Sequence, residues 1–219
     1  MAPLKPHWKQ PSHPGIQELI ISNDQEFTSK SLSKISVAPF GLYAKMDFPP
    51  CTLSETPTYA TVQCGLEKHL DLNSDLMFIN HSCEPSLIFD TVNFNVIAGP
   101  QGLAPGDELT FFYPSTEWSM AQPFACTCGK PTCRGRISGA GDMTPAQLDG
   151  VWLNLHIREL LDQKRQKQTS VAGGTQTESD GAGKVLAGQG DAGSPAGLTR
   201  RGASSRELSG EMGGDTVVA

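Results

Sequence analysis

Residues 80–113 read NHSCEPSLIFDTVNFNVIAGPQGLAPGDELTFFY. This stretch holds three short apolar or alternating runs, at 87–89, 92–98 and 108–112, which proline, glycine, asparagine and aspartate separate. Runs of this length, rich in Val, Ile, Phe and Tyr, are typical of short β-strands. We therefore expect a mainly β fold of many short strands. Similar runs precede the stretch at 16–21, 35–38, 41–46 and 59–64.

The regions between these runs exclude one common fold class. They contain no long amphipathic helix pattern, whereas a parallel sheet needs helical crossovers between its strands. Neither G-x-G-x-x-G nor a P-loop is found among the strand-sized runs, residues 16–112. A doubly wound nucleotide-binding fold is therefore not expected.

Aromatic residues and glycines divide the chain into a foldable part and a tail. All aromatic side chains lie between Trp8 and Trp152, whereas 12 of the 23 glycines fall in residues 165–219. A glycine-rich segment without aromatic residues has too little apolar surface to offset the entropy lost on folding. We expect an irregular arm with four prolines over residues 1–15 and a disordered tail over residues 166–219.

The charge balance limits the partners. Lys and Arg number 17 against 23 Asp and Glu, so the net charge is −6. A protein that binds nucleic acid directly would normally show a concentrated basic face. No signal-peptide pattern and no run of about 18 apolar residues is found. We expect an intracellular protein, cytoplasmic or nuclear and not secreted, with neither nucleic acid nor a membrane as a direct partner.

A capping box marks a helix after the strand region. Thr144 is the expected N-cap, Pro145 suits the first helical position, and Gln147 completes the box. Apolar residues then recur at helical spacing. We expect a single helix over about residues 144–164 that packs on the core or docks a partner. Its apolar stripe is Leu148, Val151, Trp152 and Leu155.

Three cysteines form the pattern Cys-x-Cys-x4-Cys at Cys126, Cys128 and Cys133. In a reducing compartment such a cluster is more often a metal site than a set of disulfides. A tetrahedral zinc site needs a fourth ligand, and Cys83 is the best candidate. A closed four-cysteine site is structural, because it leaves no position for water. Two further candidates stay open, Cys51 and Cys64.

Three ordered motifs carry a resemblance to a known family. They are Asn80-His81-Ser82-Cys83-Glu84-Pro85, Gly106-Asp107-Glu108-Leu109-Thr110-Phe111-Phe112-Tyr113 and Cys126-x-Cys128-x4-Cys133-Arg134-Gly135. In this order and at these distances they resemble the SET domain with its cysteine-rich post-SET segment. The glycine turn before residues 42–44 resembles the N-terminal cofactor motif of that family. The resemblance covers residues 35–137.

The resemblance implies a SET-domain fold in which the segments carrying Asn80 and Tyr113 cross as a pseudoknot. S-adenosylmethionine would bind on one side, and a lysine side chain would enter a narrow channel from the other. Gly41 and Leu42 would approach the methionine part of this cofactor. Asn80 and His81 would hold it, and Tyr113 would be the catalytic residue that lines the methyl-transfer channel.

The resemblance also implies that the cysteines hold structural zinc. The metal would pin the post-SET segment over the channel, where Phe124 or Ile137 would cover the cofactor. The implied ligands are Cys83, Cys126, Cys128 and Cys133. The expected division of the chain is an arm (1–15), a SET domain (16–123), a post-SET segment (124–140), a C-terminal helix (141–165) and a disordered tail (166–219).

Four residues depart from the family pattern. Pro39 stands where the first of two glycines is usual, and Met77 stands where an arginine often precedes the Asn-His segment. Ser86 replaces an asparagine, and Phe112 replaces an aspartate, which removes a charge and a hydrogen-bond acceptor. Pre-SET cysteine arrays are missing.

Three functions follow from the resemblance and these departures. The first is S-adenosylmethionine-dependent methyl transfer to a lysine amine in a basic segment of a protein, which the acidic composition suits. The second is a tailoring enzyme of the same fold that acts on a small metabolite in a biosynthetic pathway. The third is a catalytically inactive binding module that structural zinc stabilises. The methyl acceptor, the degree of methylation and the oligomeric state are left open by the sequence.

Overall fold

The computed structural model describes residues 6–22 and 28–172. The mainly β fold expected from the sequence is confirmed. Most of the predicted tail, residues 173–219, lies outside the described residues, as does the start of the arm, residues 1–5. The strands are β1 (Gln17–Ser22), β2 (Thr28–Ser33), β3 (Leu42–Lys45), β4 (Thr52–Ser54), β5 (Thr61–Gln63), β6 (His69–Asp71), β7 (Asn80–His81), β8 (Leu87–Asp90), β9 (Asn95–Ala98), β10 (Thr110–Phe111), β11 (Phe124–Ala125) and β12 (Arg136–Ile137). The helical elements are the 3-10 turns η1 (Asp75–Phe78), η2 (Tyr113–Ser115) and η3 (Ala140–Asp142) and the α-helices α1 (Pro145–Leu148) and α2 (Leu155–Ala172).

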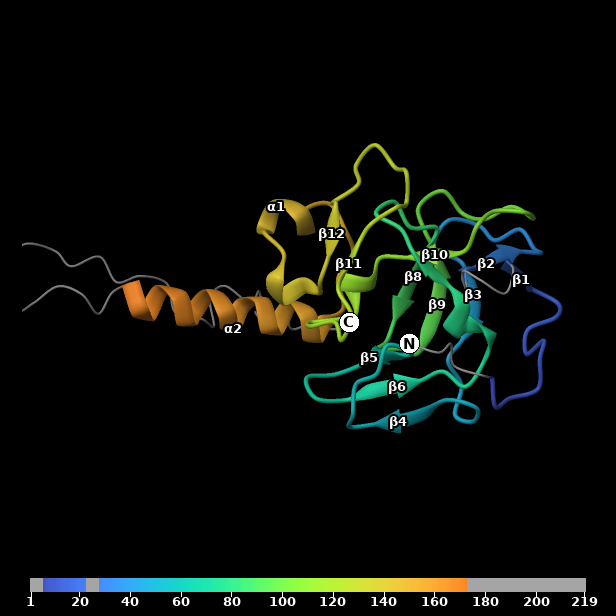
Figure 1. The fold of residues 1–219 in the computed structure, drawn as a ribbon, viewed down its shortest axis with the longest axis horizontal. Helices are drawn as coiled ribbons and strands as arrows, with labels where there is room; N and C mark the ends of the chain where they lie inside the picture. Colours follow the sequence, from blue (N-terminus) through green and yellow to red (C-terminus); the bar gives the residue numbers. More distant parts are fainter. Residues whose placement is uncertain (1–5, 23–27, 173–219) are drawn as a thin grey trace, which may run out of the picture. The chain divides into compact units, whose positions relative to one another are not determined.

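The strands form small sheets rather than one large sheet. Strands β3, β9 and β8 form an antiparallel sheet in that order, and β4, β6 and β5 form another (Figure 1). In the β8–β9 pair, Phe89 lies opposite Val96, and both side chains are fully buried. Their neighbours along each strand are partly exposed, as expected when one face of a sheet covers the core.

Strands β7 and β10 bring together two segments that are far apart in the sequence. They form a parallel pair in which Asn80 lies opposite Thr110 and His81 lies opposite Phe111. The pairing continues where the Ser82 amide donates to the Phe111 carbonyl over 3.0 Å. A tight turn cannot join parallel neighbours, and here the β8–β9 hairpin lies between them in the chain. The two segments that were expected to cross therefore lie side by side.

Two apolar clusters form the core, and Tyr113 packs against both of them. The larger cluster lies among the sheets and includes the fully buried Phe89 and Leu70. The smaller cluster lies among the C-terminal elements and includes the fully buried Ile137 and Ile157. Because packed interiors leave side chains few alternative rotamers, this position holds Tyr113 firmly in place.

A buried carboxylate anchors the N-terminal arm. Residues 6–15, the described part of the arm, contain no helix or strand. Trp8 Nε1 and Gln10 Nε2 each donate to Asp75 Oδ1 over 2.8 Å, and the Ser12 amide donates to Asp75 Oδ2 over 2.7 Å. These donors satisfy a carboxylate whose residue is only 2% exposed. The arm is thus irregular in conformation but fixed in position.

The C-terminal helix differs from the sequence prediction. The predicted capping box is present, with the Gln147 amide donating to Thr144 Oγ1 over 3.3 Å, but α1 ends after four residues at Leu148. Gly150 then adopts a φ of +69°, a left-handed conformation that ends a helix. Helix α2 begins at Leu155 and continues to Ala172, so residues 166–172 are helical rather than part of a disordered tail. In the described part of the chain, no helix is both long enough and apolar enough to cross a membrane.

A fully buried asparagine explains the break between α1 and α2. Asn154 Nδ2 donates to the carbonyls of Phe89 and Ser115, both over 2.9 Å. Asn154 Oδ1 accepts from the amide and the hydroxyl of Thr91 over 3.0 and 2.9 Å. These bonds fix residue 154 against β8 and η2, and the preceding residues leave the helix to reach it. The predicted stripe residues Val151 and Trp152 therefore lie in a non-helical segment.

Candidate active site

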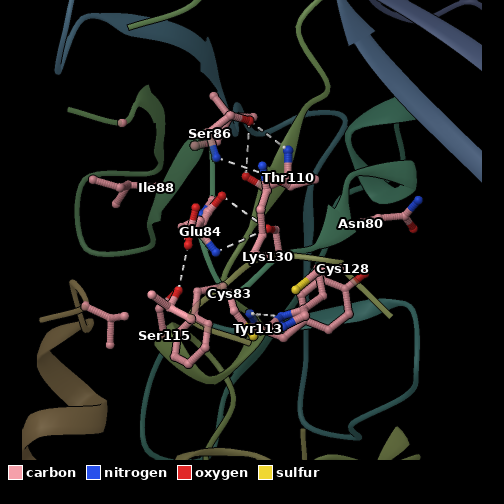
Figure 2. Close-up of a pocket in the computed structure, with 18 of the residues that line it drawn as sticks. Asn80, Cys83, Glu84, Ser86, Ile88, Thr110, Tyr113, Ser115, Cys128 and Lys130 are labelled. Carbon is pink, nitrogen blue, oxygen red and sulfur yellow. Dashed lines mark hydrogen bonds between the residues drawn. The ribbon is translucent and has the colours of Figure 1, made fainter. Parts of the chain in front are cut away.

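A cavity of about 1310 Å³ lies where β7, β10 and the cysteine-bearing segment meet (Figure 2). Its walls are formed by residues 80–88, 99–102 and 149–152, together with side chains of β10, η2 and the segment from Phe124 to Arg134. Pockets for one small ligand usually enclose about 300–1,000 Å³. The cavity can therefore accommodate a cofactor together with part of a second reactant.

Four of the predicted catalytic and cofactor-binding residues line this cavity together. They come from β7, η2 and β11, which are held side by side by strand pairing and by the apolar clusters. Gly41 and Leu42 are not among the lining residues, and Leu42 is 49% exposed at the start of β3. The four that line the cavity are Asn80, His81, Tyr113 and Phe124.

The turn before β3 reaches the cavity through a residue that the sequence did not single out. Phe40 lines the cavity wall, is 61% exposed and has a φ of +58°, an uncommon conformation for a bulky side chain. Gly41 is required by close packing, because a Cβ there would lie 2.8 Å from Val37 Cγ1 and 2.9 Å from the Ala38 carbonyl oxygen. Its place beside Gly41 was the only sequence signal for Phe40.

The side chain of Asn80 is turned toward β2. Its amide donates to the Ser29 carbonyl, and Ser29 also lines the cavity. In Figure 2 the amide group points away from Tyr113. The Asn80 side chain therefore helps to build the wall on the β2 side.

Tyr113 stands at the centre of an aromatic group. Its ring centroid lies 4.6 Å from that of Phe111, 5.3 Å from that of His81 and 6.1 Å from that of Phe124. The hydroxyl donates to the Ile79 carbonyl over 3.3 Å. Burial raises the pKa of Tyr113 to about 12. The phenol is thus neutral at physiological pH and acts as a polar contact rather than as a base.

His81 contacts both Tyr113 and the cysteine cluster. Its Nδ1 accepts from the Tyr113 amide over 3.2 Å, and its Nε2 lies 3.4 Å from Cys83 Sγ. Burial, and then the nearby Arg134 charge, lower the pKa of His81 to about 4. The imidazole is therefore neutral at physiological pH.

The four cysteines of the expected zinc site come together. The Sγ atoms of Cys83, Cys126, Cys128 and Cys133 all lie within 4.8 Å of one another. Cys83 Sγ lies 3.8 Å from Cys126 Sγ, and a tetrahedron with Zn–S bonds of about 2.3 Å has edges of about 3.8 Å. The other two candidates lie elsewhere: Cys51 Sγ donates to the Leu72 carbonyl, and Cys64 Sγ donates to the Lys68 carbonyl.

The protonation of these thiols also fits a metal site. For Cys128, burial opposes ionisation, but hydrogen bonds that include those from the backbone amides of Cys83 and Lys130 outweigh it and lower the pKa to about 6. Burial raises the pKa of Cys126 to about 12. One thiolate beside protonated neighbours is the starting point from which a divalent metal displaces the remaining protons. The cluster therefore has the composition and geometry of a structural zinc site.

Two of the departures from the family pattern are accommodated by specific contacts. Ser86 Oγ donates to the Glu108 carbonyl over 2.7 Å and accepts from the Thr110 amide over 2.9 Å, so it ties the first motif to β10 (Figure 2). Phe112 is 2% exposed, and the Arg134 guanidinium lies 5.5 Å from its ring centroid. A cation–π contact thus occupies the place of a charged hydrogen-bond acceptor.

Arg134 is a further functional candidate that sequence reasoning missed. Its backbone amide donates to Cys83 Sγ over 3.3 Å, and its Nε donates to the Gln147 carbonyl over 2.8 Å. It therefore links the cysteine cluster to α1. The available signal was its place directly after Cys133 in the third motif.

The chain is similar over most of its length to one curated relative. It is 42% identical over 168 residues to the methyltransferase flvH of Aspergillus flavus, a match that covers 75% of this chain and 92% of that protein. It is also 33% identical over 73 residues to the histone-lysine N-methyltransferase ash1 of Drosophila melanogaster. The chain belongs to the SET-domain methyltransferase family. The matched part of the Drosophila SET-domain protein is only 3% of its length, and 31% of this chain.

Further comparisons are consistent with this membership but narrower. This chain is 38% identical over 66 residues to the H3 lysine-4 specific histone-lysine N-methyltransferase of Schizosaccharomyces pombe. That match covers 28% of this chain and 7% of the yeast protein. The structure was also compared with the crystal structure of KRYPTONITE in complex with mCHH DNA, an H3(1-15) peptide and SAH. The TM-score is 0.39 at 22% sequence identity, and the match covers 55% of this chain and 29% of that chain. A likeness at this level carries no argument. No protein-family model matches the chain.

Family membership confirms the sequence-based identification and the cofactor expected from it. SET-domain methyltransferases use S-adenosylmethionine as the methyl donor, and the four-cysteine cluster of this chain is compatible with structural zinc. The chain is thus a SET-domain protein of the methyltransferase type. Its methyl acceptor is a separate matter.

Proposed function

We propose that this protein transfers a methyl group from S-adenosylmethionine to a lysine amine in a basic segment of a protein substrate. Tyr113 is the proposed catalytic residue, and Gly41, Leu42, Asn80, His81 and Phe124 are the proposed cofactor-binding residues. Cys83, Cys126, Cys128 and Cys133 are the proposed zinc ligands. An intracellular location, cytoplasmic or nuclear, is part of the proposal.

The meeting of two distant motifs in one cavity carries the proposal. Asn80 and His81 on β7 and Tyr113 after β10 are 32 or more residues apart, yet all three line the same cavity because β7 and β10 pair in parallel. A cofactor bound at β7 and an acceptor approaching Tyr113 would therefore share one cavity. Such positioning of two reactants can supply much of the rate acceleration of a transfer reaction.

The residues around Tyr113 suit the chemistry of methyl transfer. S-adenosylmethionine supplies a methyl group on a positively charged sulfur, and the attacking amine must be neutral. Free lysine has a pKa of about 10.4, so a site that disfavours a second positive charge and excludes water promotes the neutral amine. The rings of His81, Phe111 and Phe124 exclude water around Tyr113. The Tyr113 hydroxyl donates to the Ile79 carbonyl, which leaves its oxygen free to accept a hydrogen bond from the amine.

The cysteine cluster contributes by holding one wall of the cavity. Strands β11 and β12 pair with Phe124 opposite Ile137, and three of the cysteines lie between them in the chain. Zinc bound to these thiolates would fix the segment that carries Phe124 against the cavity. Because a closed four-cysteine site has no open position, the metal would take no part in the transfer itself.

Charge and the relatives support a basic acceptor. Four acidic residues line the cavity, Glu84, Asp107, Glu108 and Asp149, of which Glu108 is paired with Lys30 over 3.2 Å. Arg134, one of the cationic residues of the wall, is engaged by three main-chain carbonyls. A surface of this kind attracts lysine-rich and arginine-rich segments. Two of the matched relatives are named histone-lysine N-methyltransferases.

A small amine metabolite is the second candidate acceptor. The relative that matches over 92% of its length is named only as a methyltransferase, whereas the matches to the histone-lysine enzymes cover 31% and 28% of this chain. The cavity has room for a compact molecule beside the cofactor. The same transfer chemistry would apply to any amine that reaches Tyr113 in neutral form.

Labelled methyl transfer tests the proposal. The zinc-loaded protein is incubated with radiolabelled S-adenosylmethionine and cell extract, and the label is measured separately in protein and in the small-molecule fraction. Label on lysine in protein supports the first acceptor, and label only in small amines supports the second. The Tyr113→Phe variant should lose about 100-fold in turnover, whereas the exposed Tyr59→Phe serves as the matched control. Unchanged turnover in Tyr113→Phe, or no transfer at all, contradicts the proposal.

A further inference from the structure

The two ring nitrogens of His81 have different partners. Nδ1 lies 3.2 Å from the amide of Tyr113, and Nε2 lies 3.4 Å from Sγ of Cys83. Cys83 lies in the bend that follows β7, two residues after His81, and this bend brings its side chain beside the imidazole. The pairing of His81 with Phe111 then places Tyr113 within reach of Nδ1. One imidazole thus contacts both the cysteine cluster and the proposed catalytic residue.

The direction of both hydrogen bonds follows from the donors. A backbone amide can only donate, so Nδ1 of His81 is the bare nitrogen that accepts from Tyr113. The proton of the neutral ring is then on Nε2, which points at Cys83 Sγ. Sulfur therefore accepts this bond.

Aromatic contacts restrict the rotation of the ring. The His81 centroid lies 5.5 Å from that of Phe112, 5.3 Å from that of Tyr113 and 5.8 Å from that of Phe124. Two of these rings stand nearly perpendicular to the imidazole, at 73° and 77°. A ring packed in this way cannot shift one nitrogen without moving the other. The contact at the sulfur therefore influences the contact at the amide.

We propose that His81 is a positioning residue through which an occupied zinc site orders the backbone of Tyr113. The inference rests on the proposed function and deepens it, because it gives the metal an effect on the reacting residue beyond holding the post-SET segment. A metal bound to Cys83 would hold its Sγ in place, and the contact with Nε2 would then hold the imidazole. Without the metal, the Cys83 side chain can move, and the Tyr113 amide loses a fixed partner.

Two substitutions separate the two contacts. In His81→Asn the side-chain oxygen can replace Nδ1 as acceptor for Tyr113, but nothing reaches Cys83. In His81→Gln the amide nitrogen can replace Nε2 as donor to Cys83, but the acceptor for Tyr113 is lost. His7→Asn is the control, since His7 lies exposed on the arm and contacts Asn73.

Zinc release and amide exchange are the measurements, and neither depends on turnover. Removing an outer-shell donor to a metal ligand typically weakens binding 10–100-fold. We expect His81→Asn to release zinc to a chromophoric chelator about tenfold faster or more than wild type, and His81→Gln to stay within a few-fold. We expect the Tyr113 amide to exchange with deuterium faster in His81→Gln than in the wild type. In the wild type, we expect it to exchange faster after zinc removal than before. The Val96 amide of β9 is the internal reference for both comparisons.

Other results overturn the inference. Equal zinc release in His81→Asn, His81→Gln and His7→Asn would mean that no hydrogen bond from His81 supports the metal site. Faster exchange at Tyr113 and Val96 alike after zinc removal would mean general loosening rather than a specific link. A wild type that shows the expected zinc and exchange behaviour but transfers no methyl group would contradict the proposed function and leave the link standing. A wild type that transfers methyl while the variants show no split would contradict only the link.

Discussion

Asn154 offers a quantitative test of how the C-terminal region supports the site. The residue is fully buried and makes four side-chain hydrogen bonds, two to Thr91 and one each to the carbonyls of Phe89 and Ser115. Ser115 ends η2, the turn that begins with Tyr113. Asn154→Ala removes all four bonds at once. The substitution therefore acts on stability and on the turn that carries Tyr113.

The expected loss follows from the number of bonds. At about 1 kcal/mol for each intramolecular hydrogen bond, Asn154→Ala should lower the free energy of unfolding by about 4 kcal/mol. This is at the upper end for a single substitution and is typical of a broken buried network. The exposed Asn93→Ala, which removes a contact with Asp90, should cost about 0.5 kcal/mol or less.

Urea unfolding of the zinc-loaded protein, followed by circular dichroism, measures both variants. The midpoint should fall strongly for Asn154→Ala at an unchanged slope, and hardly at all for Asn93→Ala. A loss below about 1 kcal/mol for Asn154→Ala would refute the reasoning, because that value corresponds to one hydrogen bond rather than four. Turnover measured well below the unfolding midpoint should also fall if η2 is loosened.

Three further substitutions test other parts of the structure. By metal analysis, Cys128→Ser should contain well below one zinc per chain, whereas the control Cys51→Ser should keep its zinc. Retention of zinc in Cys128→Ser would show that the ligand set is wrong. Asp75→Asn should release the arm, which a red shift in Trp8 emission would show, and an arm that stays in place would contradict this. Burial opposes ionisation of Asp75, but the hydrogen bonds from Trp8, Gln10 and Ser12 outweigh burial and lower the pKa of Asp75. The wild type should therefore show the same red shift only as pH falls below the ordinary carboxyl range of about 4. Burial raises the pKa of Glu117 to about 7, so stability falls as pH rises from about 4.5, where the carboxyl of the unfolded chain ionises, to about 7, where that of the folded chain ionises too. Glu117→Gln should therefore have a higher melting temperature than wild type at about pH 8 and a smaller advantage at about pH 5, and an equal difference at both values, or the same gain in the exposed Glu67→Gln, would exclude this ionisation as the cause.

Much of the site could be predicted because its residues carry strong local signals. The pattern at Cys126, Cys128 and Cys133 indicates a metal site by spacing alone, and Cys83, the best candidate for the fourth ligand, lies in the same cluster. The expected crossing of the segments that carry Asn80 and Tyr113 came from the family resemblance. Local periodicity describes each strand but does not say which distant strand it pairs with.

The features that the sequence did not reveal depend on contacts between distant residues. The helix break at Gly150 follows from bonds of Asn154 to residues 39 to 65 positions away, whereas the helical spacing of Val151 and Trp152 favours a continuous helix. The arm is fixed by Asp75, whose carboxylate accepts hydrogen bonds from residues more than 60 positions earlier in the chain. In both cases a buried polar group outweighs local propensity, because leaving it without partners would cost more than ending a helix or ordering a loop.

The backbone strain at Phe40 was likewise not predicted from the sequence. Phe40 at positive φ was not singled out, although its neighbours Pro39 and Gly41 were. A bulky residue in this conformation is kept only where the surroundings over-determine it. Its side chain is exposed at the cavity wall.

A co-crystal structure with S-adenosylhomocysteine tests the central claim most directly. The ligand should lie in the cavity beside the paired strands β7 and β10, with its sulfur facing the ring of Tyr113 and its remainder along the wall that includes His81 and Phe124. Density for the ligand at another place on the protein, or in this cavity with its sulfur turned away from Tyr113, would contradict the account.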